Sequence, residues 1–223
     1  QAKLMGAKRT VVHLHFNLGS IEFNRMMYDQ TILHYKEALK LAKAMNFHEG
    51  VVFSHIGLSE FYREQGKIKK GKQHLERAIQ AAKRVDMKYL HIDCVKEEID
   101  YLLLARKLKK ADVLSKKMLT ELRLERNIAY KVNSFIYRGK IFAELKKYTS
   151  AHTHYNKALN HIKKYPNSRL AGEVYYLRGV AYKKQGRLRE ALKMFLESSC
   201  IFRSTGNLRF LDKIEKEIVE TRI

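Results

Sequence analysis

Apolar residues recur with a helical period along nearly the whole chain. In residues 12–25 and again in 29–45, they lie three and four positions apart, which places them on one face of a helix. Two such segments joined by a short stretch predict a helix hairpin, and the pattern continues to 206. A last segment, 208–222, carries Phe210, Leu211, Ile214 and Ile218 on one face and predicts a single closing helix.

The hairpins repeat with a period of forty residues. One column of mostly small residues is Gly19, Ser59, Ile99, Gly139 and Gly179. A second column is Thr31, Gly71, Ala111, Ala151 and Ala191. Apolar or small columns keep the same spacing, among them Ala38, Ala78, Met118, Ala158 and Ser198. Small residues let paired helices approach closely. We therefore expect one domain over 1–223, with repeats near 12–46, 52–86, 92–126, 132–166 and 172–206 and a cap at 208–222.

Turn residues stand where each helix has to end. Gly66 and Gly186 follow the first helix of their hairpins, where a left-handed backbone costs glycine least. Asparagine or aspartate recurs near the end of each second helix, where both tolerate turn geometry. These residues are Asn46, Asp86, Asn127, Asn167 and Asn207.

The columns resemble the tetratricopeptide repeat. The resemblance is carried by Leu18-Gly19 with Tyr35 and Ala38, by Tyr62-x-x-x-Gly66 with Ala78, and by Gly179-x-x-Tyr182-x-x-x-Gly186 with Ala191 and Phe195. The usual repeat has ~34 residues, so this version is similar to the forty-residue form of bacterial peptide-sensing regulators and kinesin light chains. Glu22, Ile99 and Ser115 depart from the pattern, and we expect the third repeat to pack least tightly.

The resemblance implies an all-α, right-handed superhelical solenoid whose first helices line a concave peptide groove. Read from the repeat register, the groove is apolar at its N-terminal end and charged further along. The peptide-groove residues are Phe16, Phe23, Asn24, Phe53, Ile56, Glu60, Arg63, Lys96, Asp100, Asn133, Lys140 and Tyr176.

Composition agrees with a helical protein, and charge adds a second candidate surface. The chain is 45% hydrophobic with one proline, but 45 Lys and Arg against 23 Asp and Glu give a net charge of +22. Positive charge concentrates at the turns within the hairpins, most densely in 104–110. A basic ridge at these turns would attract phosphates, while a solvated rim that keeps the protein soluble is the plainer interpretation. The basic-ridge residues are Lys67, Lys69, Lys70, Arg106, Lys107, Lys109 and Lys110.

Sequence motifs give no support to catalysis or to a cofactor. Residues 66–72 nearly match a nucleotide-binding loop, but Gln73 stands where a magnesium-binding Ser or Thr is needed. His91 and Cys94 share a helix face, yet two ligands fall short of a structural zinc site. We expect no catalytic residue, no metal and no cofactor. The isolated Cys94 and Cys200 and the lack of a long apolar run favour a cytoplasmic protein without a membrane partner.

The sequence therefore favours a non-catalytic scaffold that binds a protein or peptide in the groove. The first alternative is a module that binds an acidic partner or nucleic acid along the basic ridge. The second is the ligand-sensing domain of a larger regulator.

Overall fold

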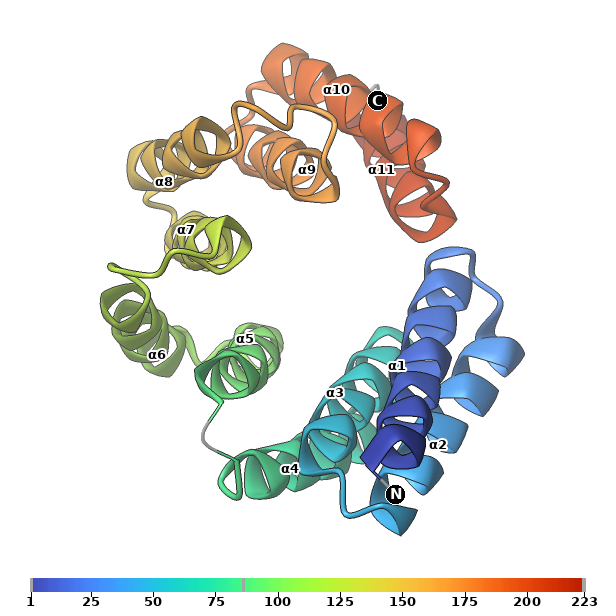
Figure 1. Ribbon diagram of the computed structural model, residues 1–223. Coiled ribbons are helices and arrows are strands. Elements are labelled where there is room, and N and C mark those ends of the chain that lie inside the picture. The colour runs from blue at the N-terminus through green and yellow to red at the C-terminus, as the bar shows by residue number, and fades with distance from the viewer. Residues whose placement is uncertain (1, 86, 222–223) are drawn as a thin grey trace. The chain divides into compact units, whose positions relative to one another are not determined.

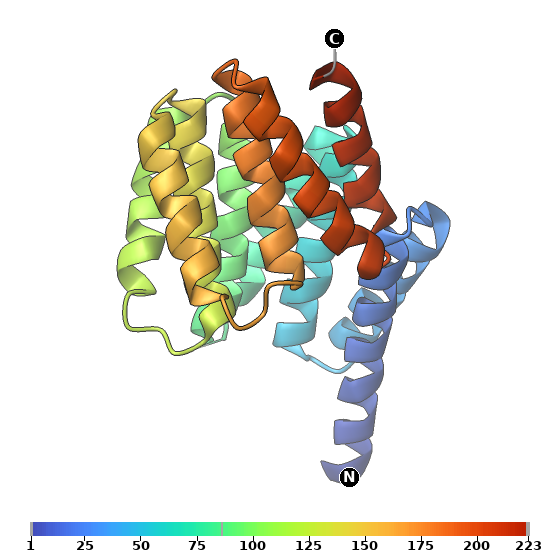
Figure 2. The same ribbon diagram turned by 90° about the horizontal axis from the view of Figure 1, so that it is seen from above.

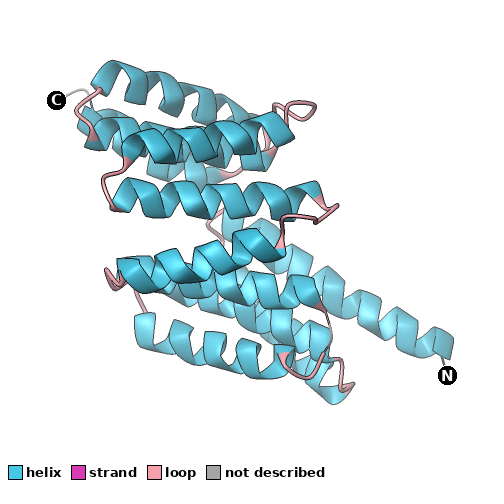
Figure 3. Cartoon of the chain, turned by 90° about the vertical axis from the view of Figure 1, so that its left-hand side faces the viewer, coloured by secondary structure: helices cyan, strands magenta, loops and turns pink. Residues whose placement is uncertain are grey.

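The all-α expectation is confirmed by the computed structural model, which describes residues 2–85 and 87–221 and side chains from Gly6 onward. This part of the chain contains eleven α-helices and no strand, and short loops join the helices (Figure 3). Residues 86 and 222, which limit the second expected repeat and the expected cap, lie outside the described residues. The chain divides into two compact units, residues 1–101 and 102–223.

The first unit holds two complete hairpins. Its helices are α1 (Ala2–Asn24), α2 (Tyr28–Ala44), α3 (His48–Glu64), α4 (Ile68–Ala82) and α5 (Lys88–Leu104), whose last residues lie beyond the unit's limit. Helix α1 packs on α2 and α3 on α4 (Figure 1), and α1 also packs on α3. Helix α1 begins about ten residues earlier than its apolar pattern predicts.

The second unit continues the same pattern and ends in the closing helix. Its helices are α6 (Leu108–Glu121), α7 (Ile128–Glu144), α8 (Tyr148–His161), α9 (Arg169–Lys184), α10 (Leu188–Ser204) and α11 (Leu208–Thr221). The hairpins α7–α8 and α9–α10 lie side by side (Figure 2). Helix α11 packs on α10 and α9, with its Ile214 fully buried. The Lys183 ammonium of α9 binds the Glu217 carboxylate of α11 at 2.8 Å.

Within the described residues, no helix is long and apolar enough to cross a membrane. Of the two cysteines, Cys94 is buried and Cys200 is exposed.

All five turns within the hairpins use one backbone conformation. Gly66 and Gly186 have φ of 71° and 75°, in the left-handed region that the sequence predicts for them. The equivalent residues of the other repeats are not glycine, yet Met26, Arg106 and Lys146 have φ of 63°, 56° and 58°.

The geometry is the same in each turn because the same two backbone hydrogen bonds close it. In the fourth repeat, the Lys146 N–H donates to the Ala143 carbonyl at 3.0 Å, and the Lys147 N–H donates to the Phe142 carbonyl at 2.8 Å. These bonds satisfy carbonyls at the end of α7 and hold residue 146 in a conformation that side chains with a Cβ disfavour.

Replacing Lys146 with glycine should therefore raise the free energy of unfolding by about 0.5–1 kcal/mol. Relief of the left-handed strain exceeds the extra backbone entropy of glycine in the unfolded chain. Urea denaturation measures the change.

The control is Lys157→Gly, because Lys157 is an exposed residue within helix α8. There the same substitution should destabilise by about 1 kcal/mol. A loss of stability in both variants would contradict the interpretation of the turn.

Candidate functional site

The apolar end of the predicted groove is present in the first unit. Phe16 of α1 and Phe53 of α3 lie with their ring centroids 4.7 Å apart, and the His13 ring lies 4.9 Å from that of Phe53. All three side chains are half-buried. They form an aromatic cluster with an edge open to solvent, of a kind that holds an apolar side chain of a partner.

Two other residues assigned to this end pack inward. Phe23 is only 2% exposed and lies in a core cluster with Leu58 and Phe61, so it offers no surface to a partner. The repeat pattern predicted Phe23 on the groove face, because Phe23 lies one helical turn from Ser20. In the structure, the Phe23 ring instead packs between α1 and α3. Ile56 is half-buried and packs against the core formed by α3, α4 and α5.

The charged end of the groove is a network that joins α3 to α5. The Arg63 guanidinium donates from Nε to Glu97 Oε1 at 3.0 Å and from Nη2 to Glu97 Oε2 at 3.2 Å. It also lies 3.8 Å from the Asp100 carboxylate. Ser59 Oγ donates to Glu97 Oε1 at 3.0 Å. Of the predicted groove residues, the structure thus brings Arg63 and Asp100 together. Glu60, one turn before Arg63 on α3, is half-buried.

Burial controls the protonation of this network. Burial raises the pKa of Glu97 to about 7 although the Arg63 charge acts in the opposite direction. Burial also lowers the pKa of Arg63, but the Glu97 and Asp100 carboxylates raise it by more, so Arg63 stays charged. Glu97 therefore titrates near neutrality beside a permanent cation.

Lys96 lies on the same helix as these carboxylates. Its ammonium binds Asp93 of the preceding turn at 2.9 Å, and both side chains are half-buried. Lys96 is thus held by its own helix, whereas Arg63 connects α3 to α5.

Of the four remaining groove residues, Asn24 belongs to the first unit, and Asn133, Lys140 and Tyr176 belong to the second. Asn24, at the end of α1, and Asn133 of α7 are half-buried, and neither side-chain amide makes a hydrogen bond within the described residues. The Lys140 ammonium lies 4.5 Å from the centre of the Tyr137 ring. Tyr176 is half-buried and packs on Phe195 and Phe210, next to α11.

The basic-ridge residues fall into two groups, one in each unit. Lys67 is the N-cap of α4, and Lys69 and Lys70 stand in its first turn. Lys107 is the N-cap of α6, and Lys109 and Lys110 stand in its first turn. All seven basic-ridge residues are exposed, and Arg106 pairs with Glu144 at 2.6 Å.

Two histidine pairs were missed at the level of sequence, although their spacing repeats every forty residues. His15 and His34 approach at 3.1 Å between their Nδ1 atoms, and His55 and His74 at 2.9 Å. Each pair joins the two helices of one hairpin. Since one nitrogen must donate and the other accept, the hydrogen bond requires at least one neutral ring. In the part of the chain that is described, no group of three or more His, Cys, Asp or Glu residues could hold a metal ion.

The family model of the tetratricopeptide repeat matches residues 132–204, which comprise helices α7 to α10. Residues 132–204 thus contain tetratricopeptide repeats. Asn133, Lys140 and Tyr176 lie within the matched repeats. No curated protein sequence matches the chain.

Solved structures extend the likeness of fold over most of the chain. The apo form of RapI superposes with a TM-score of 0.62 at 18% identity, covering 91% of this chain and 74% of RapI. BtubC (BKLC) from P. vanneervenii superposes with a TM-score of 0.54 at 13% identity, covering 91% of each chain. At these identities, the likeness concerns the fold alone. The tetratricopeptide repeat fold thus extends on both sides of the matched residues.

Removing one partner of the Arg63–Glu97 pair should destabilise the protein. Glu97→Ala should lower the free energy of unfolding by about 3 kcal/mol, because it removes the carboxylate that binds two guanidinium nitrogens of a largely buried Arg63 and leaves Glu64 at 3.1 Å and Asp100 at 3.8 Å. The double variant Arg63→Met, Glu97→Leu should recover part of that loss, since it removes both charges and keeps the volume.

Urea denaturation of Arg63→Met, of Glu97→Leu and of the double variant gives the coupling energy. Lys96→Ala serves as the control, because its half-exposed pair within one helix should contribute less than about 0.5 kcal/mol. Additive losses at Arg63 and Glu97 would show that the pair is not coupled.

Proposed function

We propose that this chain is a non-catalytic interaction module that binds a peptide segment of a protein partner on the first helices of its repeats. The tetratricopeptide repeat fold is in general a scaffold for protein interactions. The observation that carries the proposal is a surface of mixed character on α1, α3 and α5 of the first unit. There the half-buried aromatic rings of Phe16 and Phe53 and the charged network of Arg63 and Asp100 occupy neighbouring first helices.

The two asparagines support the recognition of a peptide backbone. Each side-chain amide of Asn24 and Asn133 offers two donors and an acceptor, which match the N–H and C=O groups of any extended peptide. Half-buried amides without a hydrogen-bond partner in the described residues are available for such contacts. In each unit, a partner segment would then be held by its backbone at that unit's asparagine, and in the first unit it would also be selected by its side chains at the aromatic cluster.

The test uses peptides selected from a random display library on the immobilised chain. Asn133→Ala should weaken binding of a selected peptide by about two- to tenfold, the effect of one lost hydrogen bond. The midpoint of thermal unfolding should stay nearly unchanged, because the amide packs on little. Isothermal titration calorimetry and a thermal melt measure the two effects.

Asn156→Ala is the matched control, since Asn156 is an exposed asparagine on the second helix α8. Unaltered affinity for every selected peptide in both the Asn24→Ala and Asn133→Ala variants would exclude the groove as the binding surface.

A second candidate function is the binding of a polyanion at the basic-ridge residues. The N-caps of α4, α6, α8 and α10 are Lys67, Lys107, Lys147 and Arg187. A cation at a helix N-terminus is disfavoured by the helix dipole, which is positive there. Lys67, Lys69, Lys107, Lys109 and Lys110 have no carboxylate within ion-pair distance in the described residues. An anionic chain would relieve this repulsion.

For this second function, the affinity for a single-stranded oligonucleotide should fall log-linearly with salt, because each phosphate contact releases about 0.7 counterions. Reversing two charges by Lys107→Glu and Lys110→Glu should flatten the slope by about one unit or more. Fluorescence anisotropy over a salt series gives both slopes.

The control reverses the exposed Lys163 and Lys164, which follow α8 and stand apart from the hairpin turns. We expect weak binding that is indifferent to base sequence, since no helix combines a basic face with an Asn or Arg array suited to base edges. Sequence-specific binding that persists at high salt would make nucleic acid the main ligand.

A further inference from the structure

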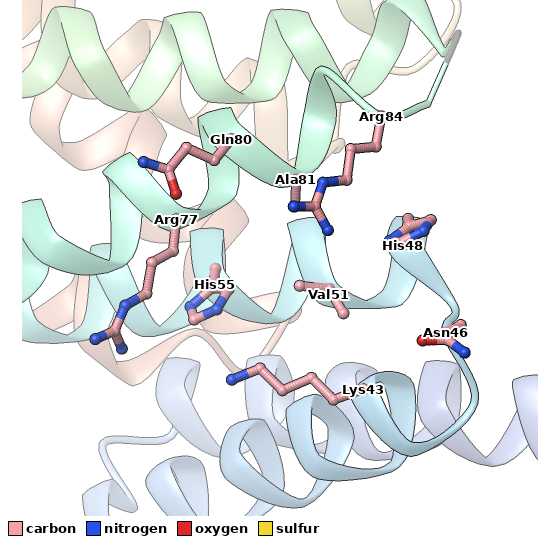
Figure 4. Close-up of a pocket in the computed structure, with 9 residues that line it drawn as sticks. All are labelled: Lys43, Asn46, His48, Val51, His55, Arg77, Gln80, Ala81 and Arg84. Carbon is pink, nitrogen blue, oxygen red and sulfur yellow. The ribbon is translucent and has the colours of Figure 1, made fainter.

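The first unit contains a cavity of about 280 Å³ between α2, α3 and the end of α4. Figure 4 shows its lining: Lys43 of α2 extends toward His55 of α3, Arg77 of α4 lies on one side of His55, and Arg84 lies on the other side, near Val51. The other lining residues are Asn46, His48, Val51, Gln80 and Ala81. Three cations, two imidazoles and two amides thus surround the cavity, and none of the described residues that line it is acidic.

Within the described residues, no acidic side chain pairs with any of the three cations. Neither Lys43, Arg77 nor Arg84 has a carboxylate within 4.0 Å in the described part of the chain. Lys43 lies in the last turn of α2, and Arg84 lies just beyond α4, where the helix dipole favours a cation. The dipole does not account for Arg77, which stands inside α4, or for the convergence of all three on one cavity.

Two of these cations, Lys43 and Arg77, act on the His55–His74 pair, of which His55 lines the cavity. Burial, together with the nearby His74, Lys43 and Arg77, lowers the pKa of His55 to about 3. Burial, together with Arg77, Lys70, Lys43 and Lys36, lowers the pKa of His74 to about 4. Both rings are therefore neutral at physiological pH.

We propose that this cavity binds the phosphate or diphosphate group of a small molecule. Two guanidinium groups and one ammonium match a doubly charged anion by charge, and guanidinium forks match the geometry of phosphate oxygens. The neutral histidines and the Asn46 and Gln80 amides supply further donors for the remaining oxygens or for an attached hydroxyl group. This surface is separate from the peptide groove and from the basic-ridge residues.

The size of the cavity sets the class of ligand. A volume of about 280 Å³ corresponds to about nine water molecules at roughly 30 Å³ each. It exceeds what a single phosphate needs and is slightly smaller than the sites of about 300–1,000 Å³ that hold drug-sized ligands. A diphosphate, or a phosphate ester of a small polyol, fits this range.

The experiment titrates the whole chain with inorganic phosphate, pyrophosphate and glycerol 3-phosphate by calorimetry at physiological salt, with glycerol as the uncharged control. We expect saturable binding of at least one phosphate compound and none of glycerol. Preference for glycerol 3-phosphate over inorganic phosphate would indicate an ester as the ligand, and the reverse would indicate the free anion. Either supports the proposal.

Three variants decide whether binding occurs in the cavity. Arg77→Gln and Arg84→Gln should each weaken binding about tenfold, the effect of losing one charge-assisted hydrogen bond. Lys83→Gln removes an exposed cation at the same helix end that does not line the cavity, and it should change affinity less than about twofold. Arg77 and Arg84 are exposed, so their variants should keep the wild-type melting temperature.

Nuclear magnetic resonance supplies a second readout at the histidines. A bound anion should raise the pKa of His55 and leave that of His152 unchanged, because His152 lies on α8 outside the cavity. The absence of saturable binding, equal weakening in Lys83→Gln and Arg84→Gln, or a His55 pKa that does not respond to the bound compound would overturn the proposal.

Discussion

The close approach of two helices at a small residue is the constraint on which the repeats depend. A Cβ atom on Gly139 would lie 2.3 Å from the Tyr155 ring, and one on Gly179 would lie 2.5 Å from Phe195. No side chain fits there, so the aromatic ring of the second helix rests directly on the backbone of the first. The ring is nearly or fully buried in each case, which couples the two helices of the hairpin through one large contact. Everything that a repeat presents to solvent is positioned by this contact.

The period of forty residues made this packing predictable, because the same volume must be filled at the same place in each repeat. The third repeat has Ile99 in the small column and Ser115 in the large one, and both side chains are fully buried. Looser packing of the third repeat stays a prediction. The turns were predictable only where glycine marked them. Arg106 and Lys146 adopt the same left-handed backbone because the hydrogen bonds of the turn impose it, and a sequence of basic residues gives no sign of that.

Polar chemistry was less predictable, because the position of a polar residue in the repeat does not determine which partner its side chain binds. The register placed Arg63 and Asp100 on one surface, but it missed Glu97, the carboxylate that Arg63 binds most closely. Helix periodicity identifies the face of the helix on which a residue lies. Which residue its side chain then bonds to depends on the side-chain rotamers. Phe23 illustrates the opposite failure, since an aromatic residue near the edge of the groove face gains more by turning into the core. Lys43, Arg77 and Arg84 come from different positions of two repeats, so no column could have shown that they converge.

The net charge of +22 thus includes two groups of cations, one at the hairpin turns and one around the cavity. The lysines at the hairpin turns point into water, where their mutual repulsion and their attraction for anions are both screened beyond about 10 Å at 0.1 M salt. The cations Lys43, Arg77 and Arg84 are exposed as well, but they line one cavity together with His55. An anion that enters this cavity would lie near several of them at once, within the distance over which salt does not screen charges. For this reason a compact phosphate suits the cavity, and a long flexible polyanion suits the turns.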